Sequence, residues 1–445
     1  MILFINFFTT LLVSVNIIDV FGNNVFTRPL EPVDNRFNRY VSEKAYEDYQ
    51  ILSMKLSNKK QLDRALALES TLNVSIDFWS VDKNADHYTV KGFIKKKDLK
   101  TIETFLKKNR MEYVVSEHNL DELIRHENEK SSNYQFNQVT GFDYSRYHNY
   151  FEIVDEMKSL VKSFSTIASI INLGKTYENR DMLAVKIAVK QSPNRKTFFF
   201  MCGLHAREWV TTATCIYMIK EMLNGYKKDA NIAAMLNKMD WVILPVANVD
   251  GYVYSWKDAS TRLWRKTRKP TNYQCTGADP NRNFDFQWGR VGTSNDPCSD
   301  IYPGSKPWSE KCVFNIAQYL RNNRNTLSGF IDIHAYSQLW MTPWGYTTEL
   351  PKDYKEQMRV ASAAAKALYN KHGTVFKVGP SSVIIYPTSG ASDDWAYGAL
   401  GLKYSYGLEL RDKGQYGFIL PASQIIPTAE ETLESFKVMA SEIVL

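Results

Sequence analysis

An apolar run at residues 197–201 (TFFFM) is the feature that most constrains how this chain of 445 residues folds. Such a run of bulky residues predicts a buried strand, and Gly203 opens a short loop directly after it. Ligands of open α/β sheets collect where strands end in such loops. His205 and Glu208 lie three positions apart in this loop, so both side chains can reach one small cation. Catalytic zinc takes three protein ligands, so we expect the third far along the chain.

A second apolar strand, predicted at residues 328–336 (SGFIDIHAY), contains a candidate for that third ligand, His334. Each motif alone has an ordinary explanation, because His-x-x-Glu is often a surface turn and a lone histidine is often structural. Two histidines at two strand ends make a metal site the better interpretation. The other five of the seven histidines lie in polar or helical contexts, and we expect them to be solvated: His87, His118, His126, His148 and His372.

A third predicted strand, at residues 403–412 (KYSYGLELRD), carries a carboxylate near its end, Glu409. A carboxylate that lies beside a catalytic metal without binding it can act as general base. Spacing alone leaves another interpretation open, in which Glu409 forms a surface ion pair with Arg411 or Lys403.

Helical patterns alternate with apolar strands from about residue 136 to the C-terminus. This alternation predicts an α/β domain with a mixed sheet and helices on both faces. We expect helices at 150–164, 209–224, 312–323, 355–372 and 428–443, and strands at 197–201, 240–246, 329–334 and 403–408.

Six stretches of this region resemble zinc metallocarboxypeptidases of the pancreatic A/B type, and they occur in that family's order. They are HAREW (205–209), RLWRKTR (262–268), DPNRNFD (279–285), DIHAYSQ (332–338), SGASDDWAY (389–397) and ELRDKGQYGFILPASQI (409–425). The resemblance implies an eight-stranded sheet and one Zn²⁺ per chain, held by His205, Glu208 and His334. A His₂Glu zinc site is the known arrangement of carboxypeptidase A.

The resemblance also implies how a peptide is cleaved at its C-terminus. Glu409 is then the base that later protonates the leaving amine, and Arg265 polarises the scissile carbonyl. Arginine recognises a free carboxylate through two parallel hydrogen bonds. The residues implied in substrate binding are Arg207, Asn281, Arg282, Tyr336, Tyr386, Asp393 and Phe418. Without the resemblance, the cations of RLWRKTR would be interpreted as a solvated basic face.

The preference for the last side chain depends on Asp393, two residues before Trp395, which the resemblance places at the base of the pocket. A carboxylate there resembles the B type, which removes Lys and Arg, because a buried charge needs an opposite partner. Ser381 is at a wall position of the pocket where the B type also has a small residue, so it agrees with a B-like preference. Gly345 is more like the residue that the A type has at its position. If Asp393 points away and Asp394 makes only a structural contact, the alternative is an A-like enzyme that releases apolar or aromatic residues.

Other classes of function are less consistent with the sequence. The net charge of +7 is modest and spread along the chain, so we expect no nucleic-acid partner. A non-catalytic module that holds zinc or peptide without turnover is a third hypothesis. The presence of all three ligands, the base and Arg265 disfavours it.

The N-terminal residues predict a secretory signal peptide at 1–22, because the chain is uncharged from Ile2 until Asp19. The same stretch is nearly long enough to anchor in a membrane. We favour secretion and no stable membrane association, since no later stretch is long enough to span a bilayer. The sequon Asn73-Val74-Ser75 would then lie on secreted material.

Residues 23–130 are expected to form an activation propeptide before a catalytic domain at 131–445. Within about 40–128, the pattern predicts a ferredoxin-like β-α-β-β-α-β fold. Its expected elements are strand 49–56, helix 59–72, strands 75–81 and 88–93, helix 97–107, strand 111–116 and helix 120–126. By resemblance this unit inhibits its own enzyme, and a trypsin-like protease would cut near Arg125 or Lys130. An ordinary charged linker that is never cut is the alternative.

The five cysteines fit an oxidising compartment. The resemblance implies a disulfide between Cys275 and Cys298, which would stabilise the fold by about 3 kcal/mol. We expect Cys202 to be a free buried thiol. Whether Cys215 pairs with Cys312 stays open.

Overall fold

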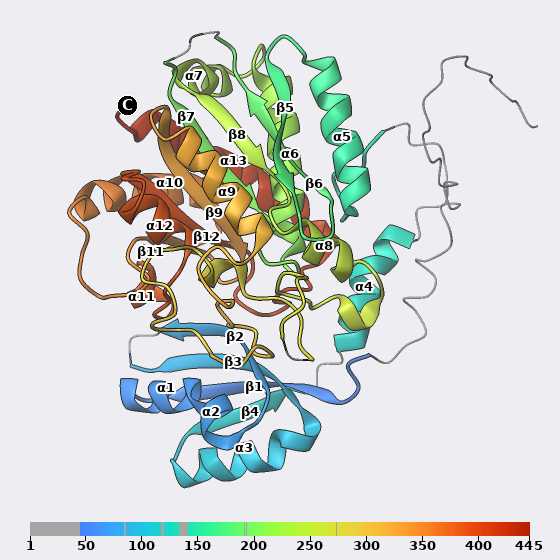
Figure 1. Ribbon diagram of the computed structural model, residues 1–445, viewed down its shortest axis with the longest axis vertical. Helices are drawn as coiled ribbons and strands as arrows, with labels where there is room; N and C mark the ends of the chain where they lie inside the picture. Colours follow the sequence, from blue (N-terminus) through green and yellow to red (C-terminus); the bar gives the residue numbers. More distant parts are fainter. Residues whose placement is uncertain are drawn as a thin grey trace, which may run out of the picture.

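The computed structural model describes residues 45–445 except 84–85, 117–119, 133–140, 191, 193 and 273, and it describes the backbone but not the side chains of 128–132. These residues form a small N-terminal domain and a large C-terminal domain (Figure 1). The expected signal peptide and the stretch around residue 40 lie outside the described residues, as does His118. No helix of the described part of the chain combines the length and apolar character needed to cross a membrane.

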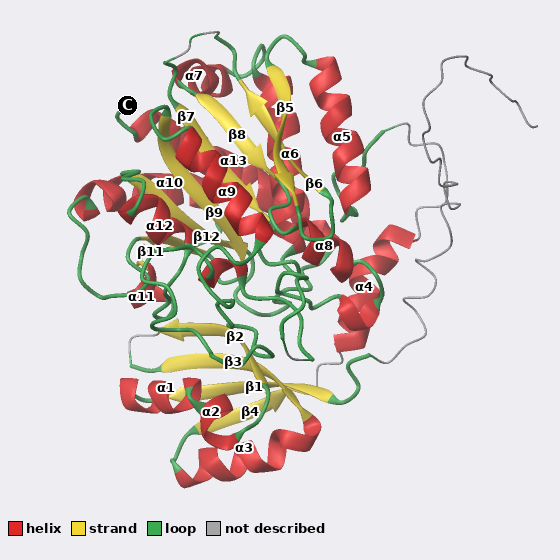
Figure 2. Ribbon diagram, in the orientation of Figure 1, coloured by secondary structure: helices red, strands yellow, loops and turns green. Residues whose placement is uncertain are grey.

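The N-terminal domain is a four-stranded sheet in the order β2-β3-β1-β4, with helices on one face (Figure 2). Its elements are β1 (Tyr49–Leu56), α1 (Lys59–Leu66), α2 (Leu68–Leu72), β2 (Ile76–Lys83), β3 (Tyr88–Lys95), α3 (Lys96–Lys108) and β4 (Glu112–Ser116). The paired strands are antiparallel, so the expected ferredoxin-like fold is confirmed. The helix predicted at 59–72 is divided in two at Ala67. Helix α4 (Leu120–Ser132) leads toward the second domain.

The C-terminal domain contains an eight-stranded mixed sheet in the order β11-β10-β12-β9-β7-β8-β6-β5. The strands are β5 (Ala168–Lys175), β6 (Asp181–Ile187), β7 (Thr197–Cys202), β8 (Asp240–Leu244), β9 (Leu327–Ala335), β10 (Leu339–Thr342), β11 (Lys377–Pro380) and β12 (Tyr404–Leu410). Strands β12, β9, β7 and β8 are parallel neighbours. Every residue of β7 and β8 is buried, as expected for strands that are covered on both faces.

Helices cover both faces of this sheet, as the sequence predicted (Figure 2). They are α5 (Tyr150–Ser163), α6 (Trp209–Gly225), α7 (Ala230–Lys238), α8 (Val249–Ser255), α9 (Lys311–Asn322), α10 (Tyr354–His372), α11 (Ser381–Ile384), α12 (Ser392–Gly398) and α13 (Ile425–Glu442). Helix α13 packs against both α6 and α10, and α9 packs against β5. The two outer strands at each side of the sheet, β11 and β10 on one side and β6 and β5 on the other, were not predicted, because they are short or carry polar residues between the apolar ones.

One cysteine prediction is wrong and another is confirmed. Cys202 is not a free thiol, because it forms a disulfide with Cys215 that joins the end of β7 to α6. Their Cα atoms are 6.4 Å apart, within the range that a disulfide spans. Cys275 and Cys298 are bonded, as expected. Cys312 is buried and free.

Candidate active site

The pairing of the parallel strands brings the predicted site residues together. Strands β7 and β9 are neighbours, so the loop after β7 and the end of β9 lie at the same edge of the sheet. This places His205 and Glu208 beside His334. Glu409 of β12 is the direct strand partner of His334. Three segments that are far apart in sequence therefore meet at one point, as the strand-end pattern predicted.

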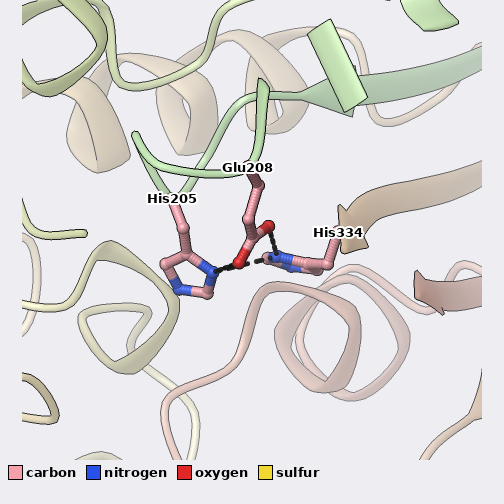
Figure 3. A group of neighbouring side chains, drawn as sticks. All are labelled: His205, Glu208 and His334. Carbon is pink, nitrogen blue, oxygen red and sulfur yellow. Dashed lines mark hydrogen bonds and ion pairs between the residues drawn. The ribbon is translucent and has the colours of Figure 1, made fainter. Parts of the chain in front are cut away.

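His205, Glu208 and His334 form a compact group (Figure 3). All three side chains are buried, and their potential ligand atoms lie within 4.8 Å of one another. The Nδ1 atom of His205 is 2.8 Å from Oε1 of Glu208, and Nδ1 of His334 is 3.1 Å from Oε2. Both imidazoles therefore direct the same nitrogen toward a shared carboxylate.

The opposite nitrogen of each imidazole contacts a second buried carboxylate. Nε2 of His205 lies 3.0 Å from Oδ1 of Asp279, and Nε2 of His334 lies 2.9 Å from Oδ2 of Asp332. Carboxylates in these positions fix the orientation and the tautomer of histidines that bind metals. Both aspartates occur in the recognised sequence motifs, but the sequence alone assigned neither of them a role.

The donor atoms of this group fit a zinc ion. The Nδ1 atoms of His205 and His334 are 3.1 Å apart. Apart from each other, their only partner among the described residues is the carboxylate of Glu208. Two unprotonated nitrogens this close repel each other unless a proton or a cation lies between them. Two imidazoles with one carboxylate are a known ligand set of catalytic zinc.

Glu409 lies next to this group and lines the same cavity. Its Oε2 atom is buried and has no hydrogen-bond partner among the described residues. Desolvation raises the pKa of its carboxyl well above the usual range. Arg411 instead bonds to Glu431, and Lys403 is exposed. The alternative of a surface ion pair is therefore wrong.

The predicted cationic and amide residues also reach the cavity. Arg265 donates to Asp279 over 2.8 Å, and its Nη1 atom lies 3.9 Å from Oε1 of Glu208. Asn281 and Arg282 lie on the three-residue 3₁₀ turn Pro280–Arg282, and both line the cavity. Arg262, Arg265 and Lys266 are buried, so the basic residues of RLWRKTR do not form a solvated face.

Asp393 lies in the first turn of α12 and lines the cavity, 6% exposed. A Cβ atom added at Gly407 would be 3.6 Å from its Oδ2 atom. Asp394 points elsewhere, because its carboxylate accepts the backbone N–H groups of Gly345 and Tyr346. The structural contact therefore belongs to Asp394, while Asp393 stays at the cavity. Burial raises the pKa of Asp393 to about 6, and nearby Asp332 adds to the effect.

The remaining predicted binding residues surround the cavity, which also borders the N-terminal domain. Tyr386 lines it and packs against the core of the N-terminal domain. Tyr336 and Phe418 are buried with their rings 5.1 Å apart. The guanidinium of Arg207 lies 4.0 Å from the ring centroid of Phe418. The structure thus brings every predicted site residue to one place.

Strand β2 of the N-terminal domain closes this cleft. Both carboxylate oxygens of Asp77 accept hydrogen bonds from Arg207, and the ring of Trp79 contacts Phe418. The remaining cavity has a volume of about 60 Å³. Such a space holds a few water molecules but no amino-acid residue of a substrate. The pairing of Asp77 with Arg207 had no signal in the sequence.

A second contact between the domains is an ion pair with both side chains completely buried. Arg262 donates two hydrogen bonds of 2.8 Å to Glu127 of α4. It also donates to the backbone carbonyls of Arg207 and Phe418, and its guanidinium stacks on the ring of Trp209. Glu127 lies between Arg125 and Lys130, the two residues at which cleavage was expected.

The prediction that the remaining histidines are solvated is wrong for His148. This residue is buried beside the N-terminus of α5, where Nδ1 contacts Glu152 and Nε2 donates to the carbonyl of Asp143. Polar neighbours in sequence suggested exposure, but two of them, Asp143 and Glu152, are its hydrogen-bond partners and are themselves half-buried. His126 and His372 are exposed and His87 is half-buried.

Comparisons with known proteins agree with this geometry. A family model described as zinc carboxypeptidase matches residues 153–435, and one described as carboxypeptidase activation peptide matches residues 52–127. Carboxypeptidase A4 of Mus musculus is 38% identical over 396 residues, covering 88% of this chain and 93% of the relative. Carboxypeptidase B of Bos taurus is 36% identical, covering 89% of this chain and 94% of the relative.

Solved structures show the same two-domain arrangement. The crystal structure of thrombin activatable fibrinolysis inhibitor has a TM-score of 0.76 at 32% identity, covering 88% of this chain and 98% of that one. Carboxypeptidase A from Helicoverpa armigera has a TM-score of 0.81 at 25% identity, covering 89% of this chain and 98% of that one. Relatives named as A and as B types are nearly equally similar, so similarity does not decide between the two preferences.

Proposed function

Since this chain belongs to the zinc carboxypeptidase family and carries that family's activation peptide, we propose that it is the secreted zymogen of a carboxypeptidase that releases C-terminal Lys and Arg. The substrates are the C-termini of peptides and proteins. The observation that carries the basic preference is the carboxylate of Asp393 at the cavity that would receive the last side chain.

The proposed ligands of one zinc ion per chain are His205, Glu208 and His334. Bound zinc would polarise the scissile carbonyl and lower the pKa of water. Glu409 accepts the proton of the attacking water and passes it to the nitrogen of the leaving amine. Its buried Oε2 atom, which has no partner in the described part of the chain, is available for that proton. The guanidinium of Arg265 stabilises the negative charge that develops on the carbonyl oxygen.

The free C-terminal carboxylate of the substrate is bound by Arg282, Asn281 and Tyr386 in this proposal. Arginine is suited to this role because its planar guanidinium matches both carboxylate oxygens. Arg207, Tyr336 and Phe418 contact the preceding residues of the peptide. Asp77 of the activation peptide pairs with Arg207 in the zymogen, so substrate reaches this position only after the activation peptide leaves.

We further propose that residues 1–22 form the signal peptide, 23–130 the activation segment and 131–445 the mature enzyme. A trypsin-like protease cuts at Arg125 or Lys130. Arg125 precedes the buried Glu127 and Lys130 follows it. The choice of cleavage point therefore decides whether the partner of Arg262 leaves with the activation peptide or remains on the enzyme.

An A-like preference for apolar residues is the second candidate function. It is favoured by Met341 and Ile385, which line the same cavity, and by Gly345. The third hypothesis, a module without turnover, is disfavoured because the family and its curated relatives are carboxypeptidases.

The test of the proposed function uses the secreted full-length protein. Treatment with trypsin should convert it to an enzyme that releases a C-terminal Lys from a peptide, and a zinc chelator should stop the release. Readdition of zinc should restore it. Trypsin treatment that separates the two domains without producing any carboxypeptidase activity would contradict the proposal.

A further inference from the structure

The sequon Asn73-Val74-Ser75 lies where the activation peptide meets the catalytic domain. Asn73 ends α2 in a left-handed conformation with φ 53° and ψ 45°. Asn73 and Ser75 are exposed, while Val74 between them is buried in the core of the activation peptide. No hydrogen bond of the Asn73 side chain is found among the described residues. Both groups that a glycosyl transfer requires, the amide and the hydroxyl, therefore face solvent.

The sequon borders a hollow between the two domains. This hollow has a volume of about 700 Å³, and its walls come from α2, from the start of α3 and from the catalytic-domain loop 293–301. Pockets of about 300–1,000 Å³ hold a drug-sized molecule, so the first sugars of a glycan fit here. Hydroxyl and amide side chains of Ser70, Thr293, Ser294 and Asn295 line the hollow. Such groups hydrogen-bond to sugar hydroxyls.

Loop 293–301 is one of the segments that the activation peptide covers. It includes Cys298, the end of the Cys275–Cys298 disulfide. Ser299 donates a hydrogen bond of 3.2 Å to Glu69 of α2, across the boundary between the domains. Asn73 also precedes Asp77, the partner of Arg207, by four residues in the same segment. Sugars attached to Asn73 thus lie beside the strand that closes the cleft.

We propose that Asn73 is an N-glycosylation site, and that its first sugars occupy this hollow and contact loop 293–301. The amide nitrogen of Asn73 forms a bond to the anomeric carbon of an oligosaccharide that is activated as a lipid diphosphate. The lipid diphosphate is the leaving group, and the amide loses one proton. The inference rests on the proposed secretion, because this transfer occurs in the secretory pathway. Cleavage then removes the glycan together with the activation peptide, and the mature enzyme lacks it.

The full-length chain is expressed in secreting eukaryotic cells with an unrelated signal peptide fused to its N-terminus. Entry into the secretory pathway then does not depend on residues 1–22. Wild type, Ser75→Ala and Ser75→Thr are compared. Ser75 is exposed, so all three fold. On treatment with an N-glycosidase, the mass of wild type and of Ser75→Thr should fall in one discrete step that corresponds to a single glycan. The mass of Ser75→Ala should not change. Absence of this step in wild type, or its presence in Ser75→Ala, overturns the site.

The contact with the catalytic domain is tested by hydrogen exchange in the same zymogens. Residues 293–301 should exchange more slowly in the glycosylated wild type than in Ser75→Ala, and equal rates overturn the placement in the hollow. After trypsin treatment, the carbohydrate should be found only on the N-terminal fragment. Carboxypeptidase activity is measured separately in all three proteins, so failure of the proposed function is distinguished from failure of this inference.

Discussion

The two ends of the cleft differ in how many contacts fix their key residues. At the metal end, each histidine contacts Glu208 on one side and a second carboxylate, Asp279 or Asp332, on the other. At the pocket end, one carboxylate, that of Asp393, lies in a cavity wall that also contains apolar side chains. The proposed chemistry therefore depends on mutually supporting groups, whereas the proposed specificity depends on a single residue.

The largest effect is expected at the metal end, for Glu409→Gln. The amide keeps the shape of the side chain but cannot accept the proton, so kcat should fall by about 10²–10⁴-fold. The measurement is kcat for release of C-terminal Lys by the trypsin-activated variant. The control is the zinc content, which should stay at one per chain. Near-normal kcat would remove Glu409 from the role of base.

At the pocket end, Asp393→Ile should reverse the preference for the last residue. Loss of one partner from a buried charge pair costs about 2–5 kcal/mol. We therefore expect kcat/KM for C-terminal Lys to fall by about 30- to 4,000-fold, while release of C-terminal Phe increases. Asp285→Ala is the matched control, because Asp285 is exposed. An unchanged ratio of Lys to Phe release would show that Asp393 does not contact the last side chain.

The carboxylates that contact the two histidines should have a smaller effect, which Asp332→Asn tests through the zinc affinity. The neutral amide holds Nε2 of His334 less strongly, so zinc affinity should weaken by about 10–100-fold. Competition with a chromogenic chelator measures this directly, with Asp285→Asn as control. Wild-type affinity in Asp332→Asn would mean that His334 is oriented by other contacts.

The raised pKa of Asp393 predicts how pH affects the two substrate classes. Its pKa is about 6, so the carboxylate is ionised above pH 6 and becomes neutral below it. The KM for C-terminal Lys should therefore rise by up to about tenfold per pH unit below 6, while the KM for C-terminal Phe should not. Parallel pH profiles for the two peptides would contradict an ionised Asp393 as the partner of Lys.

The metal ligands and Glu409 could be predicted because they depend on local patterns, whereas the roles of Arg265, Arg282 and the pocket residues came from the resemblance to a known family. An apolar strand followed by a polar residue at its end is visible in sequence, and the parallel strands then place His205, His334 and Glu409 together. The packing of the N-terminal domain follows from alternating strands in the same way.

The contacts that could not be predicted join distant segments without a local signal. The pairs Asp77–Arg207 and Glu127–Arg262 are separated by more than one hundred residues, and they depend on how the two domains dock. The Cys202–Cys215 disulfide was missed because a cysteine in an apolar strand looks like a core residue, and its partner faces it only after α6 packs on β7.

The central claim is that a carboxylate at the pocket end makes this family member an enzyme for basic C-termini. It is tested most directly by kcat/KM of the activated wild type on peptides that differ only in the last residue. The account predicts that Lys and Arg are released much faster than Phe or Leu. Faster release of Phe or Leu would contradict it and establish the A-like preference.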